Sequence, residues 1–553
     1  MEVAPDAGSE LASALELKGR TVPWGIPALA VLVACAAVGL WFRLHGLAQE
    51  GFSDDELHKW LSANRYLQGD FGGDDLEHPM LMKSLIALTL IVGRKLQWAP
   101  ETITRLPNAI VASVAVILVA LLGRRLFGRT AGLFAAAIGA VSVTWIGYQR
   151  IAKEDVLVGV FLMVLCLCLA EAKAAADNGE KDRSRRFEVG GAAALAAMLA
   201  SKYYPHQIVI PVLAVFWLAR TNTAYRVPLR RWLQLIGISL VIWISLNWMA
   251  VLPSTWKYIF DYVRGATHGG RATHLTMLFM GRLYPNVFQA GLFGMPPWYF
   301  LVFAAVKQTP GVVLFSAAGL VWAIWKRHPS QRLMLTWMAV LFAAGTITGA
   351  KYARMFLPVF PAFFLLAGST AAWLIERARN VRLNFASTGL AALLAAVLIG
   401  PELLASTSHA PHFRTYISRL GGGDRRVTWY FPHCDYFDAG YREAIEYIAQ
   451  HAEPGAEIST EIDWTALYYA QRFGRGDLVV SMTRPEESCH QGRICYVAIQ
   501  TGRFYQANQR AVEKLAQRQP WHVVRIRGVD VVKVYRLPPG ESPFPSGAEA
   551  SSR

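Results

Sequence analysis

Charged residues are scarce in this sequence, and acidic residues are the scarcest. Only 17% of the 553 residues are Asp, Glu, Lys or Arg, whereas 54% are hydrophobic and the mean hydropathy is +0.29. This composition excludes an ordinary soluble protein. Repeated apolar stretches of about 20 residues are instead long enough to cross a hydrocarbon core of roughly 30 Å. The sequence therefore predicts a polytopic α-helical membrane protein.

Several motifs of cofactor chemistry are also missing. The sequence has no P-loop, no Gly-rich dinucleotide fingerprint and no zinc-hydrolase pattern. It has six cysteines, and no Cys/His spacing resembles a structural zinc site. We therefore expect no nucleotide, dinucleotide or zinc cofactor.

The net charge of +16 is concentrated in short loops between apolar stretches. These basic loops are 123–129, 181–186, 220–231, 326–332 and 376–382. The intervening loops carry acids, aromatics and prolines. This alternation follows the positive-inside rule and places the basic loops in the cytosol. The excess charge therefore indicates orientation and predicts no nucleic-acid partner.

About eleven crossings are expected from length and charge, within a membrane domain of residues 24–409. The predicted spans lie near 24–46, 106–123, 131–148, 156–174, 187–201, 206–220, 232–252, 308–325, 333–349, 355–375 and 383–404. The preceding tail, 1–23, is then cytosolic. We interpret the first span as a retained helix, because a long polar stretch precedes it and no small-residue cleavage site follows it.

Residues 80–96 are apolar but are not counted as a span. A crossing there would move the basic loop 123–129 outside. We expect a helix along the outer interface instead, because Lys and Arg interrupt its apolar face. Outer loops then cover about 47–105 and 253–307.

Residues 410–537 predict a small α/β domain outside the cytosol. "RVTWYF", "EIST", "LVVSM" and "CYVAIQ" are typical of strands, and Asp438 is expected to cap a helix in "DAGYREAIEYIAQHA". A helix at 508–518 and a closing hairpin follow. An oxidising compartment favours a disulfide between Cys489 and Cys495, leaving Cys434 free. The tail 538–553 and the first 20 residues are expected to be disordered.

Three acids, Asp54, Asp55 and Glu56, follow the first apolar run in "GFSDDELHKW". Acids at a helix start meet free backbone N–H groups and the positive end of the helix dipole, and this explains Asp54. Adjacent helical residues point about 100° apart, so one acid can cap while another faces a membrane cavity. Taken alone, the cluster favours capping.

A second acidic pair, Glu154 and Asp155, begins the fourth predicted span on the same outer side. Ionisable groups at membrane depth are costly and usually line a cavity or pathway. Arg150 and Lys153 are close enough in sequence to neutralise both acids, which is the simpler interpretation. Two acidic pairs at two outer helix starts nevertheless fit a shared polar site.

Basic and aromatic residues recur on the predicted outer side. Each alone is explained by lipid phosphates or by an interfacial aromatic belt. Together the cations suit one phosphate group of a lipid-linked substrate, and the tyrosines suit sugar stacking equally well. His78, before Pro79, is most simply a hydrogen-bonding residue at a loop corner. The recurring residues are Lys83, Arg105, Lys202, Tyr203, Lys351, Tyr352 and Arg354.

These motifs, in this order, resemble the membrane-embedded GT-C glycosyltransferases, specifically the protein O-mannosyltransferase superfamily. That group also contains the bacterial transferase that adds 4-amino-4-deoxy-arabinose to lipid A. The resemblance covers roughly residues 24–450. It rests on "DDE" after the first span, "EHPMLMK" (77–83), "RIAKEDVLVGVF" (150–161), "GAKYARMFLPVFPAFFLLAG" (349–368) and "FPHCDYFDAGYREAIEYI" (431–448).

The resemblance implies a GT-C fold in the plasma (bacterial inner) membrane, a polyprenyl-phosphate-linked sugar donor and an acceptor outside the cytosol. Asp55 then acts as general base on the acceptor hydroxyl beside Glu56, Asp155 matches the acid of the second outer loop, and direct attack inverts the anomeric configuration. Cations such as Lys202, Lys351 and Arg354 stabilise the leaving phosphate. The family's "HPPL" is "HPML" here, which weakens a donor-binding role for His78 and Lys83.

Three alternative interpretations of the acidic residues compete with this hypothesis. Paired carboxylates suit a divalent ion, but the branches that this chain resembles imply no metal, and none is predicted. A transporter or lipid flippase would use the acids for ion or proton coupling. Such proteins commonly carry inverted repeats and broken helices, neither of which is evident in the sequence. A scaffold displaying the C-terminal domain leaves the two acidic sites without a purpose.

Overall fold

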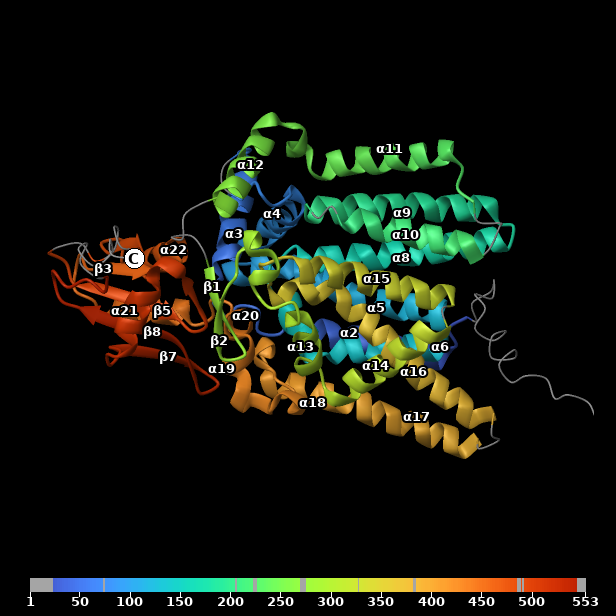
Figure 1. Ribbon diagram of the computed structural model, residues 1–553. Helices are drawn as coiled ribbons and strands as arrows, with labels where there is room; N and C mark the ends of the chain where they lie inside the picture. Colours follow the sequence, from blue (N-terminus) through green and yellow to red (C-terminus); the bar gives the residue numbers. More distant parts are fainter. Residues whose placement is uncertain are drawn as a thin grey trace, which may run out of the picture.

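Long helices that run side by side make up most of the molecule, with the C-terminal domain at one end (Figure 1). The computed structural model describes residues 23–544 except 73–74, 204–205, 222–225, 269–274, 327, 381–383, 485–488 and 490–491. The disorder predicted for the first 20 residues falls outside the described residues. Of the tail predicted to be disordered, 538–553, the structure describes 538–544, where Phe544 is buried and Glu541 pairs with Arg518.

Each predicted span coincides with a helix or with consecutive helices. These are α2 (Ile26–Leu44), α5 (Pro100–Phe127), α6 (Arg129–Val141) with α7 (Val143–Gln149), α8 (Asp155–Asp177), α9 (Lys181–Ser201), α10 (His206–Thr221), α11 (Leu229–Leu246) with η1 (Trp248–Val251), α14 (Pro310–Lys326), α15 (Pro329–Ile347), η4 (Ala353–Val359) with α16 (Phe360–Asn380), and α17 (Asn384–Leu398) with α18 (Gly400–His409). By length and composition, six helices of the described chain are suited to crossing a membrane, or seven if the bent pair α6–α7 is one span.

The bend between α6 and α7, 62°, directs the chain toward the loop that carries the second acidic pair. Ser142 at the break has an extended backbone. The buried Glu402 side chain of α18 accepts the Val143 backbone N–H at 3.1 Å and the Thr309 N–H before α14, also at 3.1 Å. The Glu402 carboxylate therefore accepts hydrogen bonds from backbone N–H groups at the starts of two helices, where such groups have no partner within the helix.

Helices α3 (Asp54–Tyr66), α4 (Met80–Lys95) and α12 (Pro253–His268) lie at the end of the bundle that faces the C-terminal domain (Figure 1). In α4, Met82, Ile86 and Leu90 are fully buried, whereas Leu88 is 62% exposed. This one-sided burial agrees with the predicted interfacial helix. The second outer loop also contains η3 (Phe288–Phe293) and α13 (Tyr299–Val306).

The C-terminal domain is built on a five-stranded mixed sheet, ordered β4-β3-β5-β8-β7. The strands are β3 (Glu457–Thr460), β4 (Val479–Met482), β5 (Cys495–Gln500), β7 (His522–Ile526) and β8 (Val529–Leu537); the helices are α21 (Tyr441–His451), α22 (Asp463–Arg472) and α23 (Gln509–Ala516). β3 pairs in parallel with β4 and β5, and β8 pairs antiparallel with β5 and β7. The predicted α/β domain and the Cys489–Cys495 disulfide are confirmed.

Three local predictions in this region were wrong or incomplete. "RVTWYF" contains the short helix α19 (Val427–Tyr430) rather than a strand, and its buried residues Val427 and Tyr430 are spaced by three. Helix α21 begins after Gly440, so Asp438 does not cap it. A second sheet was missed: β1 (Leu275–Phe279) pairs with β2 (Arg282–Pro285) and with β6 (Arg503–Tyr505), which joins the second outer loop to the C-terminal domain.

Candidate active site

Glu56 anchors the start of α3. Ser53 precedes the helix and forms a capping box with Glu56, whose carboxylate accepts the Ser53 backbone N–H at 3.1 Å. The carboxylate also accepts hydrogen bonds from the Arg105 guanidinium, at 2.6 and 2.8 Å, and from the Ala152 backbone N–H, at 3.0 Å. Burial raises the pKa of Glu56, but Arg105 and the backbone donors outweigh it and hold the pKa below its ordinary value. Glu56 and Arg105 therefore fix α3 against α5 and the loop before α8.

Asp55, next to this anchor, meets a group of cations. Its carboxylate contacts the Lys153 ammonium and lies 3.7 Å from the Arg354 guanidinium. Burial alone would raise the pKa of Asp55, yet Lys153, Arg354 and Lys59 hold it well below its ordinary value. The side chain is still 39% exposed. Asp55 is therefore an anion that a substrate can reach.

Arg354 connects Asp55 to the second predicted acid, Asp155. Its guanidinium lies 3.8 Å from the Asp155 carboxylate, which is buried and also lies 2.8 Å from the Lys202 ammonium. Two carboxylates thus share three cations: Lys153, Lys202 and Arg354. This arrangement leaves surplus positive charge beside an exposed acid, which suits the binding of an anion.

A second layer of ion pairs supports this cluster from α3 and α4. The Lys59 ammonium lies 3.0 Å from Glu154, and His78 Nε2 lies 4.0 Å from the same carboxylate. Lys83 lies 3.6 Å from Asp75 and donates to the carbonyl oxygens of Asp75 and His78. Lys59 and Asp75 were not predicted. Lys59 follows Asp55 by four residues on one helix, and that spacing is a signal that could have identified it.

Asp75, Glu77 and His78 place one ligand atom each within 4.8 Å of one another, which is a possible metal-binding arrangement. Burial raises the pKa of Asp75, but Lys59 and Lys83 outweigh it and hold the pKa below its ordinary value. Because two ammonium groups already compensate Asp75, the donor set fits a divalent cation poorly.

Three predicted residues lie outside the Asp55–Asp155 cluster. Arg150 donates to the His45 carbonyl oxygen at 2.6 Å and stacks on a phenylalanine ring, so the expected pairing with the second acidic pair is wrong. The Lys351 ammonium donates to backbone carbonyl oxygens of Thr346 and Thr348. The Tyr203 hydroxyl accepts a hydrogen bond from Asn247 at 2.8 Å.

The C-terminal domain also contributes to the first turn of α3, a contact that was not predicted. Asp438 accepts the Asp54 backbone N–H at 3.2 Å, and the Thr465 hydroxyl donates to the Asp54 carboxylate at 3.3 Å. Burial, Asp438 and Asp55 raise the pKa of Asp54 to about 6, although His58 opposes them. The helix start that Asp54 was predicted to cap is instead capped by the Ser53–Glu56 capping box and, from another domain, by Asp438.

The corner that carries Asp438 has an unusual backbone. Phe437 and Asp438 are consecutive non-glycine residues with positive φ, 44° and 63°. Left-handed conformations of such residues are costly and cluster at functional sites. The Arg354 guanidinium lies over the rings of both Phe437, at 5.4 Å, and Tyr352, at 4.3 Å. The corner therefore shapes the cation cluster as well as α3.

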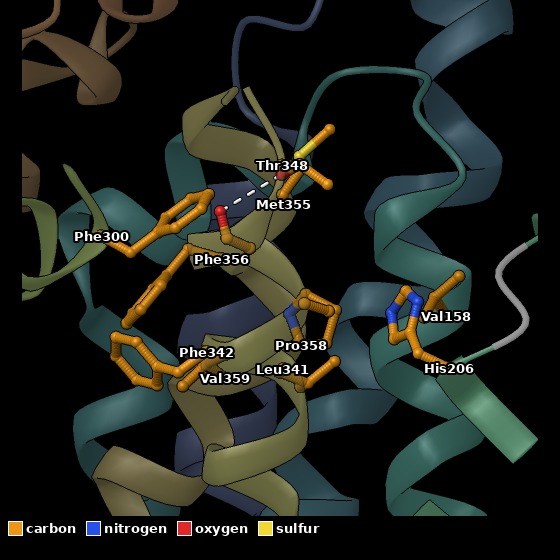
Figure 2. Close-up of a pocket in the computed structure, with 12 residues that line it drawn as sticks. Val158, His206, Phe300, Leu341, Phe342, Thr348, Met355, Phe356, Pro358 and Val359 are labelled. Atoms are coloured by element: carbon orange, nitrogen blue, oxygen red, sulfur yellow. Dashed lines mark hydrogen bonds between the residues drawn. The ribbon is translucent and has the colours of Figure 1, made fainter. Parts of the chain in front are cut away.

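An apolar cavity of about 250 Å³ is lined by residues that closely follow members of this cluster along the chain (Figure 2). Met355 follows Arg354 directly, Val158 lies one helical turn after Asp155, and His206 lies four residues after Lys202. The rest of the lining is mostly aromatic and aliphatic, with Phe300, Leu341, Phe342, Phe356, Pro358 and Val359. A charged cluster thus adjoins an apolar space between α8, α10, α15 and η4.

Comparison with known proteins agrees with this architecture. Residues 77–249 match the family model described as dolichyl-phosphate-mannose-protein mannosyltransferase. The fold is similar to that of ArnT from Cupriavidus metallidurans, solved bound to undecaprenyl phosphate and in the apo state. For each, the TM-score is 0.51 and the identity 15%, over 92% of this chain and 97% of that chain. No match among curated proteins was found.

An archaeal structure gives a weaker likeness. The apo oligosaccharyltransferase from Archaeoglobus fulgidus has a TM-score of 0.49 and 12% identity, over 86% of this chain and 69% of that chain. The family match and the ArnT fold are the stronger likenesses. On both, the predicted resemblance is confirmed: this chain has the GT-C membrane fold of the protein O-mannosyltransferase and ArnT type.

Proposed function

We propose that the protein is a membrane glycosyltransferase that moves a sugar from a polyprenyl-phosphate-linked donor to a hydroxyl group of an acceptor outside the cytosol. The observation that carries the proposal is Arg354, which lies within 4 Å of both Asp55 and Asp155 and directly precedes Met355, a residue that lines an apolar cavity. A site with surplus cations, an exposed acid and an adjoining apolar space suits a substrate with an anionic head and an apolar tail.

The donor would divide between these two environments. Its phosphate would bind Lys153, Lys202 and Arg354, which supply charged donors from three separate segments of the chain. The first isoprene units of its tail would enter the apolar cavity, whose lining includes Val158, one helical turn after Asp155. The family match over residues 77–249 and the ArnT fold support this class of donor.

Asp55 would act as the general base. The acceptor oxygen attacks the anomeric carbon, the bond from that carbon to the phosphate oxygen breaks, and the hydroxyl proton passes to Asp55. Inversion follows from direct attack, and the cations stabilise the charge on the released polyprenyl phosphate. With Lys153 and Arg354 beside it, Asp55 is a weak base. A bound phosphate would draw these cations away and so raise its basicity.

Glu56 would act as a positioning residue, because its carboxylate is already engaged by Arg105 and by backbone N–H groups. Asp155 would hold Lys202 and Arg354 in place for the donor. Both roles differ from that of Asp55, which is the exposed member of the group.

The orientation in the membrane belongs to the same proposal. The acid cluster lies at the end of the bundle that faces the disulfide-bonded C-terminal domain (Figure 1). Disulfides persist in oxidising compartments, and the basic loops favour the opposite side for the cytosol. The amino terminus would thus be cytosolic and the C-terminal domain periplasmic. The test introduces cysteines at 127 and 184 and treats intact cells with a thiol reagent from outside. Labelling of either cysteine would contradict this orientation.

The test of the activity is turnover in nanodiscs. The purified protein is supplied with polyprenyl phosphates that each carry one sugar and with cell-envelope extract as acceptor, and released polyprenyl phosphate is measured. We expect release with at least one sugar, and none with Asp55→Asn. Asp70→Asn is the matched control, because Asp70 is an exposed acid of the same loop paired only with Arg65 among the described residues. If none of the sugar donors releases polyprenyl phosphate, the proposal is contradicted.

A further inference from the structure

A second, larger apolar cavity lies between α8, α9, α10 and α11. Its volume is about 500 Å³, and nearly all of its lining is aliphatic or aromatic, including Leu165, Leu169, Leu195, Val215, Ile236 and Leu240. Helix α11 lies at the edge of the bundle beside α9 (Figure 1), and only Leu235 of its residues is buried. The cavity therefore lies under a helix that also borders the membrane.

The length of the cavity matches one leaflet of a bilayer. Its lining extends from Glu188 to Leu199 on α9 and from Trp232 to Trp243 on α11. The ends of each stretch are eleven positions apart, which in a helix corresponds to about 16 Å, about half of a hydrocarbon core of roughly 30 Å. An acyl chain that runs along the bilayer normal would fit this length.

One end of this cavity is polar and basic. Glu188 lines it and pairs with Arg231 at 2.8 Å, and Val227 and Trp232 lie beside them. Arg226 and Arg230 are exposed at the same end, and no described acid lies within 4 Å of either guanidinium. The start of α11, which carries Arg230 and follows Arg226 by three residues, lies at the end of the bundle opposite the C-terminal domain (Figure 1).

We propose that this cavity binds one anionic phospholipid, with an acyl chain between the four helices and its phosphate on Arg226 and Arg230. Basic pockets between membrane helices recognise anionic head groups in this way. A polyprenyl-phosphate donor fits less well, because its phosphate would lie at the Asp55 end. The proposal is independent of the proposed transferase activity.

The test counts bound lipids by native mass spectrometry, using full-length protein titrated with phosphatidylglycerol or phosphatidylcholine. We expect preferential binding of phosphatidylglycerol. Arg226→Gln with Arg230→Gln should weaken it roughly 30-fold, because each basic residue near a lipid surface contributes about a fivefold factor and the two factors multiply. Arg377→Gln with Arg379→Gln is the matched control, since both residues are exposed at the end of α16.

A second variant tests the cavity itself. At Gly191, an added Cβ would lie 3.6 Å from Cys168 and Leu165, which is ordinary contact, so Gly191→Leu fills the cavity without a backbone clash. We expect this variant to fold and to lose phosphatidylglycerol binding. Three results would overturn the proposal. The wild type could bind phosphatidylcholine as tightly as phosphatidylglycerol, or either variant could bind phosphatidylglycerol as tightly as the wild type. The third is a Gly191→Leu protein that loses binding of polyprenyl phosphate alone.

Discussion

Two buried charge clusters lie near the C-terminal domain, and they differ in how fully their charges are satisfied. In one, the Lys307 ammonium lies 2.6 Å from Asp435 and donates to two backbone carbonyl oxygens, at 2.7 and 3.0 Å. Nearby, Arg414 and His412 each bind one oxygen of Glu50, both at 2.7 Å. In the Arg354 cluster, by contrast, the Arg354 contacts are 3.7 and 3.8 Å long and Asp55 is exposed. A cation held by close partners, such as Lys307, indicates a structural role, whereas a cation with only long charge contacts beside an exposed acid, such as Arg354, indicates a binding site.

The largest expected effect is the loss of turnover in Asp55→Asn. The substitution keeps size and hydrogen bonding but removes basicity, so turnover should fall by about 10²–10⁴-fold. The variant should still fold, with a lower melting temperature because buried Lys153 loses its ion pair. Simple helix capping predicts an almost silent change, because Asn caps about as well as Asp. Turnover of the purified variant, measured beside its melting curve, separates the two. Near-normal turnover would remove Asp55 from the mechanism.

The variants Lys307→Met and Arg354→Met test directly whether one cluster is structural and the other binds substrate. Lys307→Met leaves Asp435 buried without its cation, which should cost about 3–5 kcal/mol of stability. In Arg354→Met, Asp55 keeps Lys153 and Asp155 keeps Lys202, so stability should change less while the KM for donor rises. Thermal melting and donor titration measure both. Equal destabilisation by the two variants would show that both clusters are structural.

Glu56→Gln should have a smaller effect on turnover than Asp55→Asn. The amide has a single accepting oxygen, so either the Ser53 or the Ala152 N–H group loses its acceptor, and the charge-assisted bonds to Arg105 are lost. Hydrogen bonds to charged groups contribute about 1.5–3 kcal/mol, so the melting temperature should fall. Turnover lost with an unchanged melting temperature would instead assign Glu56 a direct role in the chemistry.

The sequence predicted the helical bundle, the interfacial helix and the α/β domain because each follows from local hydropathy, charge and periodicity. It also predicted that Asp55 and Asp155 share one site, because both begin outer helices. It could not predict that Asp438 caps α3, since this contact joins positions 384 residues apart. Nor could it show that Lys351 binds backbone carbonyl oxygens while Arg354, three residues later, joins the acids. Those outcomes depend on tertiary packing.

The smallest expected effect concerns Asp54 and pH. Its folded pKa of about 6 lies above the ordinary value of 3.8, so the folded protein binds more protons than the unfolded chain between these pH values. Stability should therefore fall as pH rises through this interval. Asp54→Asn removes the penalty, so the variant should melt higher than the wild type at pH 7 and at the same temperature near pH 4. Because Asp54 is 38% exposed, solvent screening should hold the gain below about 1 kcal/mol. An equal gain at both pH values would mean that the substitution acts through the helix start rather than through ionisation.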